Sequence, residues 1–213
     1  MNTLTWLYPS AGQPARKTHK IIRTGAGERL ETVGYGRARE YRHETVPVAD
    51  IESLYTALAE RQQRNGFAVL GAVRPDAGGL IYRRTHGDHA DLVEVETGVL
   101  AIDLDAEAAP SDIDTGDILA VGEYLRARLP LELQDASCVV QLTAGYGLSR
   151  WKPGPVMLRA RLWFVLATPR RPSEVRRWMR ATNAAGTICQ RSPQRSISQP
   201  HACGAPPSES ASQ

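Results

Sequence analysis

Two carboxylates separated by one residue, Asp103 and Asp105, follow the apolar run at 99–102. Side chains alternate between the faces of a strand, so we expect both on one face, with Cα atoms roughly 7 Å apart. Carboxylate oxygens are preferred ligands of Mg²⁺ and Mn²⁺. Such ions serve phosphoryl and nucleotidyl transfer, where they hold phosphate oxygens and neutralise developing charge. The spacing therefore predicts half of a Mg²⁺ or Mn²⁺ site at a strand end.

A purely structural interpretation of this segment is also open. Further carboxylates follow at Glu107, Asp112, Asp114 and Asp117. The segment is then an apolar strand that runs into an acidic loop. Spacing alone does not separate this interpretation from a metal site, so the surrounding elements have to be considered.

The pattern of apolar residues predicts the elements that would position the carboxylates. Strands and helices mix without strict βαβ alternation, which favours an α+β fold. Residues 184–213 hold mainly small, polar and basic residues, and we predict that they form a disordered tail after one domain at 1–183. The predicted strands are 3–8, 19–23, 30–33, 67–73, 80–84, 98–104, 138–143 and 158–167, and the predicted helices are 50–64, 117–129 and 173–182.

Composition restricts the partners and the compartment. The net charge of +3 is a weak argument for nucleic acid, although only three of the 26 basic residues are lysines. Arginine binds phosphate through two parallel hydrogen bonds, but codon bias in a GC-rich genome would also explain this preference. Three cysteines without a paired spacing favour a reducing cytoplasm. Apolar runs approaching the ~20 residues of a membrane span are absent from the sequence, so we expect no membrane partner.

Three segments in order resemble a known family. They are Leu-Ala-Ile-Asp-Leu-Asp at 100–105, Val-Gln-Leu-Thr-Ala-Gly-Tyr-Gly-Leu at 140–148 and Leu-Arg-Ala-Arg-Leu-Trp-Phe-Val-Leu at 158–166. Together they resemble the prim-pol domain of the archaeo-eukaryotic primase superfamily, in the form found in phage and plasmid primase-helicases. The resemblance covers 1–183 and implies a mixed sheet with an RRM-like catalytic core. The implied activity is that of a DNA primase or polymerase, a nucleotidyltransferase of DNA replication.

The resemblance also implies a role for particular residues. Asp103 and Asp105 match the catalytic acids that bind Mg²⁺ or Mn²⁺. Thr143 and Tyr146 fall in the element that contacts the nucleotide's phosphates, where Tyr146 stands in place of the family's histidine and carries no positive charge near neutral pH. Arg159 and Arg161 share one strand face and could supply that charge, or could simply be the solvated face of a half-buried strand.

One family feature is missing from this sequence. A third acid is expected on a later strand, yet only Glu174 and Glu209 follow the strand at 158–167, and neither has an apolar strand around it. We therefore expect a C-terminally truncated domain with little or no activity. The implied partners are nucleoside triphosphates, a single-stranded DNA template and a replicative helicase acting in trans.

Two alternative functions fit the same residues. One is a non-catalytic remnant that binds single-stranded nucleic acid, whose bases could stack on Trp163 and Phe164. In an apolar strand, however, these aromatic residues are more often part of the core. The other is a nucleotide-sugar transferase, since such enzymes also use Asp-x-Asp to hold Mn²⁺ and a diphosphate.

Overall fold

Two antiparallel sheets make up the body of the chain in the computed structural model, which describes residues 2–34, 38–83, 90–151 and 154–184. The predicted α+β class is confirmed. Where a mixed sheet was expected, every pairing between described strands is antiparallel. The N-terminal sheet has the order β5 (Phe67–Val69), β1 (Asn2–Pro9), β4 (Glu40–Val48), β7 (Ile81–Tyr82). The C-terminal sheet has the order β10 (Val139–Leu142), β11 (Met157–Arg170), β9 (Thr97–Ala108).

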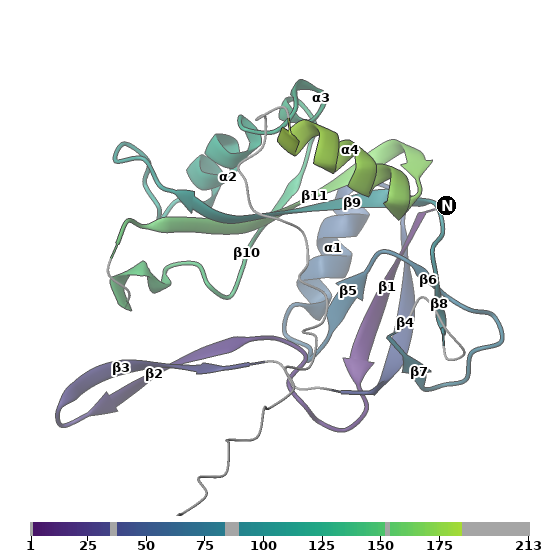
Figure 1. Ribbon diagram of the computed structural model, residues 1–213, viewed down its shortest axis with the longest axis horizontal. Helices are drawn as coiled ribbons and strands as arrows, with labels where there is room; N and C mark the ends of the chain where they lie inside the picture. Colours follow the sequence, from purple (N-terminus) through teal and green to yellow (C-terminus); the bar gives the residue numbers. More distant parts are fainter. Residues whose placement is uncertain (1, 35–37, 84–89, 152–153, 185–213) are drawn as a thin grey trace, which may run out of the picture.

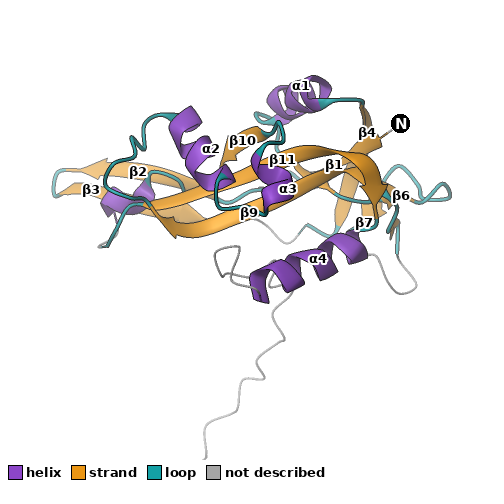
Figure 2. Ribbon diagram, turned by 90° about the horizontal axis from the view of Figure 1, so that it is seen from above, coloured by secondary structure: helices purple, strands orange, loops and turns teal. Residues whose placement is uncertain are grey.

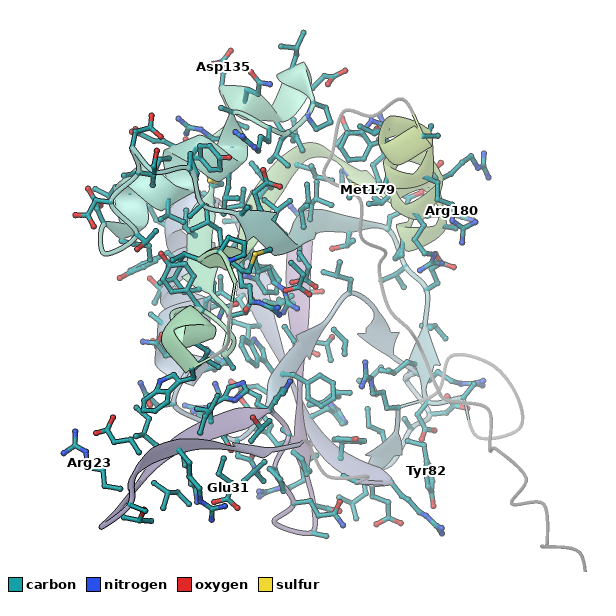
Figure 3. All side chains as sticks on the ribbon, turned by 60° about the vertical axis from the view of Figure 1, so that its left-hand side comes forward. Arg23, Glu31, Tyr82, Asp135, Met179 and Arg180 are labelled. Atoms are coloured by element: carbon teal, nitrogen blue, oxygen red, sulfur yellow. The ribbon has the colours of Figure 1, made fainter. Side chains whose placement is uncertain are left out.

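Two separate pairs of strands and the helices complete the described part of the chain (Figure 1). The ribbon of β2 (Thr18–Thr24) and β3 (Gly27–Val33) projects away from both sheets, and Arg23 and Glu31 extend from it (Figure 3). The other pair joins β6 (Ala72–Val73) to β8 (Leu92–Val93). The helices are α1 (Ile51–Arg61), α2 (Ile118–Arg126), α3 (Leu131–Gln134), the 3₁₀ turn η1 (Leu148–Trp151) and α4 (Pro172–Ala184). Of the described helices, none combines the length and apolar character needed to cross a bilayer.

The C-terminal sheet is covered on both faces, but only one face is covered along its whole length. Alternate residues such as Ile102 and Leu162 pack against α2, α3 and α4. The opposite face, through Val99 and Trp163, packs on β1 and α1 in a layer shared with the N-terminal sheet. Figures 1 and 2 show this arrangement, with α1 on the β10 side and α4 on the β9 side. Beyond Ala101 this second face leaves the apolar layer and becomes polar.

Local sequence signals explain where the long helices begin. Asp50 caps α1, since its side chain accepts a hydrogen bond from the Ser53 backbone at 2.8 Å while the Ser53 hydroxyl bonds back to the cap. Asp117 caps α2 through a single hydrogen bond, which its side chain accepts from the Leu119 amide. In the middle of α2, Gly122 lies so close to β10 that an added Cβ would be 2.7 Å from Val140 Cγ2. This glycine therefore sets how closely α2 approaches the sheet.

The sequence missed one long strand, and two of its expectations about elements need correction. The long strand β4 was not predicted, because charged residues interrupt its apolar pattern. The predicted strand at 67–73 is divided into β5 and β6, and at the break the Gly71 carbonyl accepts a 2.8 Å hydrogen bond from the Thr5 hydroxyl. The predicted strand at 98–104 continues to Ala108. The predicted disordered tail, 184–213, lies outside the described residues except for Ala184, which ends α4.

Candidate functional site

The two predicted acids lie on one exposed face of β9. Asp103 and Asp105 are exposed, whereas the intervening Leu104 is buried against α2. The antiparallel register places Arg161 opposite Asp103 and Arg159 opposite Asp105, and Gln141 of β10 pairs with Arg161. We call these five residues, Asp103, Asp105, Gln141, Arg159 and Arg161, the polar strip. It continues the sheet face that is covered by α1 and β1 at its other end.

The expectation that the carboxylates end the strand is wrong. A register shift between Leu158 and Arg159 gives β9 one extra residue after Asp105, so that Glu107 turns to the α2 side. There Glu107 accepts a 2.7 Å hydrogen bond from Arg128 Nε. Because this partner accommodates the acidic residue, the strand continues to Ala108.

Asp103 is paired with Arg161 in a forked ion pair. Arg161 Nε lies 2.5 Å from Oδ1 of Asp103, and Nη2 lies 2.9 Å from Oδ2. The Asp103 side chain is 50% exposed and that of Arg161 is 34% exposed. The guanidinium carbon lies 5.4 Å from the centroid of the Trp163 ring. Trp163 is itself buried, and its Nε1 donates a 3.1 Å hydrogen bond to Gln141.

Asp105 and Arg159 face each other across the sheet, but no ion pair joins them or binds either to another described residue. The Arg159 side chain extends instead along the loop after β10, where a Cβ on Gly145 would meet Arg159 Cδ at 2.9 Å. Thr143 begins this loop, and its backbone amide donates a 3.0 Å hydrogen bond to the Arg159 carbonyl. Arg159 and Thr143 are thus brought together beside an unpaired carboxylate.

Tyr146 lies on the other side of the sheet from the polar strip. Its partly buried ring packs against the core to which α2 contributes, and its hydroxyl donates a 2.5 Å hydrogen bond to the Thr115 carbonyl. Burial raises the pKa of the Tyr146 hydroxyl, and the nearby charge of Asp114 raises it further. The structure therefore does not bring Tyr146 together with Asp103 and Asp105.

Asp103 and Asp105 are the carboxylates of the polar strip that could bind a metal ion. Within the described ranges, no group of three or more His, Cys, Asp or Glu side chains gathers around one point. Mg²⁺ is commonly held by one or two carboxylates, with water and substrate phosphates filling the remaining positions. Asp103 and Asp105 fit that mode, in which the metal and a phosphate ligand are bound together.

One member of the polar strip, Gln141, was not foreseen from the sequence. Gln141 is a polar residue within a short apolar strand, and it shares the face of Arg161. Polar and apolar residues alternate around Gln141 in β10 as they do around Arg161 in β11, and this shared alternation could have revealed Gln141 from the sequence. Trp163 and Phe164 are 3% and 1% exposed, which confirms their interpretation as core residues.

Comparison with known proteins identifies no relative of this chain. No family model, curated protein or solved structure matches the chain. The likeness to prim-pol domains thus rests on the three sequence motifs and on the order of the elements.

Proposed function

We propose that this chain binds a nucleoside triphosphate together with Mg²⁺ or Mn²⁺ on the polar strip, as a primase–polymerase type of domain for phage or plasmid replication. The observation that carries the proposal is the register of β9 and β11. It places two exposed carboxylates, Asp103 and Asp105, against two arginines on one open sheet face. Carboxylates bind the metal ion and arginines bind phosphate oxygens, so the strip has both chemistries that a metal-bound triphosphate needs.

The order of the elements supports an RRM-like core. The chain runs β9, α2 with α3, β10, β11, α4, and its strands lie in the order β10-β11-β9. These are the first five elements of a β-α-β-β-α-β unit, with its helices on one face. The sixth strand of such a unit would lie beside β9, which has β11 as its only strand partner within the described ranges.

In the proposed reaction the side chains of the polar strip bind and orient the nucleotide. Asp103 and Asp105 would hold the metal ion, whose charge would offset that of the phosphate groups. Arg159, which has no ion-pair partner among the described residues, would bind a terminal phosphate. A primer hydroxyl on a single-stranded DNA template would attack the α-phosphate, and diphosphate would leave. With only two acids to orient these groups, we expect binding to exceed catalysis, because a misplacement of about 1 Å costs ~100-fold in rate.

The two alternative functions have less support. A remnant that stacks bases on Trp163 and Phe164 would need these rings to be accessible, and both are buried in the core. A nucleotide-sugar transferase would need an α/β nucleotide-binding half before the acids. The described strands before β9 instead pair antiparallel. A replicative helicase in trans and a cytoplasmic location remain parts of the proposal for a replication domain.

Calorimetric titration with ATP in the presence and absence of Mn²⁺ tests the proposal. We expect binding that requires Mn²⁺ and that falls at least tenfold in Asp103→Asn/Asp105→Asn, because the metal then loses both protein carboxylates. Asp135→Asn is the control, since this exposed carboxylate follows α3, which packs on the opposite face of the sheet from the polar strip; Figure 3 labels Asp135. Equal ATP binding with and without Mn²⁺ would contradict the proposal.

A further inference from the structure

The ion pair between Arg161 and Asp103 stands in the way of the proposed metal. Both Asp103 oxygens accept hydrogen bonds from one guanidinium, at 2.5 and 2.9 Å. A cation that approaches these oxygens has to displace Arg161 or share the carboxylate with a positive charge. Metal without nucleotide therefore meets a partly neutralised site.

We propose that Arg161 is a counter-ion that moves from Asp103 to the triphosphate when metal and nucleotide bind together. This inference rests on the proposed function of the polar strip. In the nucleotide-free protein, Arg161 balances the charge of Asp103. In the complex the metal ion takes over Asp103, and a phosphate group takes over the forked guanidinium, for which it is an equivalent acceptor.

The surroundings of Arg161 allow such an exchange. The Asp103 side chain is 50% exposed and that of Arg161 is 34% exposed. Ion pairs that are this exposed are weak, so a better partner can displace either residue from the other. The Trp163 ring offers a fixed surface 5.4 Å from the guanidinium carbon, because this residue is buried and bonded to Gln141. The guanidinium can thus turn toward a ligand on the open face while its stem keeps its position on the sheet.

The other charged groups of the strip do not take over this role. Arg159 lies along the loop at Gly145 and faces Asp105, which is two residues further along β9 than Asp103. Asp105 is exposed and has no ion-pair partner within the described ranges. Asp105 is therefore the carboxylate that is ready for a metal ion, and Asp103 is the one whose availability depends on where Arg161 lies.

The consequence is a coupling between the two ligands. Metal ion alone competes with Arg161, and triphosphate alone meets the negative charges of Asp103 and Asp105. Each ligand removes the obstacle to the other, and thermodynamic linkage requires this effect to be mutual. Removing the guanidinium should then act in opposite directions on the two ligands, a result that simple loss of structure does not produce.

Mn²⁺ binding measured by electron paramagnetic resonance, together with ATP titration at saturating Mn²⁺, tests the inference. In Arg161→Gln we expect Mn²⁺ alone to bind more tightly by about tenfold, because the competing cation is gone. ATP at saturating Mn²⁺ should bind about tenfold more weakly, because a phosphate contact is lost. Arg161→Lys keeps the charge without the fork and should give smaller shifts of the same signs. Arg177→Gln, an exposed arginine on α4, changes the net charge equally and should shift neither affinity.

The outcomes separate this inference from the proposed function. If the wild-type chain binds ATP with Mn²⁺ through Asp103 and Asp105 but Arg161→Gln leaves Mn²⁺ affinity unchanged, the counter-ion role is wrong and the site stands. Weakening of both ligands in Arg161→Gln also overturns the role, since the arginine then only maintains the site. If the wild-type chain binds Mn²⁺ neither alone nor with ATP, the proposed function fails, and the inference fails with it.

Discussion

Replacing Glu44 by alanine should destabilise the fold strongly, because Glu44 is the partner of a buried arginine. The Arg61 side chain is 7% exposed, and its guanidinium is bonded to Glu44, to Glu60 and to the Ala57 carbonyl. Breaking a buried ion pair by removal of one partner costs about 3–5 kcal/mol. Glu44 is 35% exposed and Glu60 would remain, so we expect about 2–3 kcal/mol.

Urea denaturation followed by circular dichroism measures this loss as a lower midpoint. Glu60→Ala is the matched control, since this carboxylate is 57% exposed and its pair with Arg61 should contribute less than about 1 kcal/mol. Adding Arg61→Met to Glu44→Ala should restore most of the stability, because the unpaired buried charge is replaced by an apolar side chain of similar length. The reasoning would be refuted if Glu44→Ala were as stable as Glu60→Ala, or if the double variant were no more stable than Glu44→Ala.

The same contact predicts a dependence on pH. The Arg61 guanidinium hydrogen bond lowers the pKa of Glu44 below its ordinary value of 4.5, and the Tyr8 hydroxyl adds to this effect. A carboxyl whose pKa is lower in the folded state contributes stability above its unfolded pKa, and the contribution is lost as the pH falls through the folded pKa. The stability difference between the wild-type chain and Glu44→Gln should therefore be constant above pH 4.5 and shrink below it.

Three further predictions concern the C-terminal sheet. Tyr146→Phe should cost about 1 kcal/mol in urea denaturation, because the Thr115 carbonyl loses its donor, and should leave Mn²⁺-dependent ATP binding unchanged; a large loss of ATP binding would place Tyr146 at the site after all. Gly122→Ala should lower the melting temperature, since its Cβ would be 2.7 Å from Val140 Cγ2, and Val140→Ala should relieve the loss; an unchanged melting temperature would mean that α2 shifts freely. Primer extension on single-stranded DNA should be absent or very feeble, and Tyr146→His should not restore it; robust extension abolished by Asp103→Ala would contradict this prediction.

Strand alternation is a local property, and it was sufficient to place Asp103 and Asp105 on one face. Helix periodicity and capping residues such as Asp50 likewise located α1, because these signals depend on neighbours within a few residues. The strand β4 escaped prediction for the opposite reason. Its charged residues are accommodated by contacts with distant residues, as when Glu44 meets Arg61.

The amino-acid sequence by itself determined which residues share a strand face, because the side-chain period of a strand is set by covalent geometry. Only the tertiary structure decided which residues of other elements that face contacts. Asp103 and Arg161 are 58 residues apart in the chain, and their pairing depends on the register of β9 against β11. The packing of the Tyr146 ring against the core likewise depends on which sheet face the helices cover. Register and coverage follow from the packing of the whole core, which a local pattern of residues does not encode.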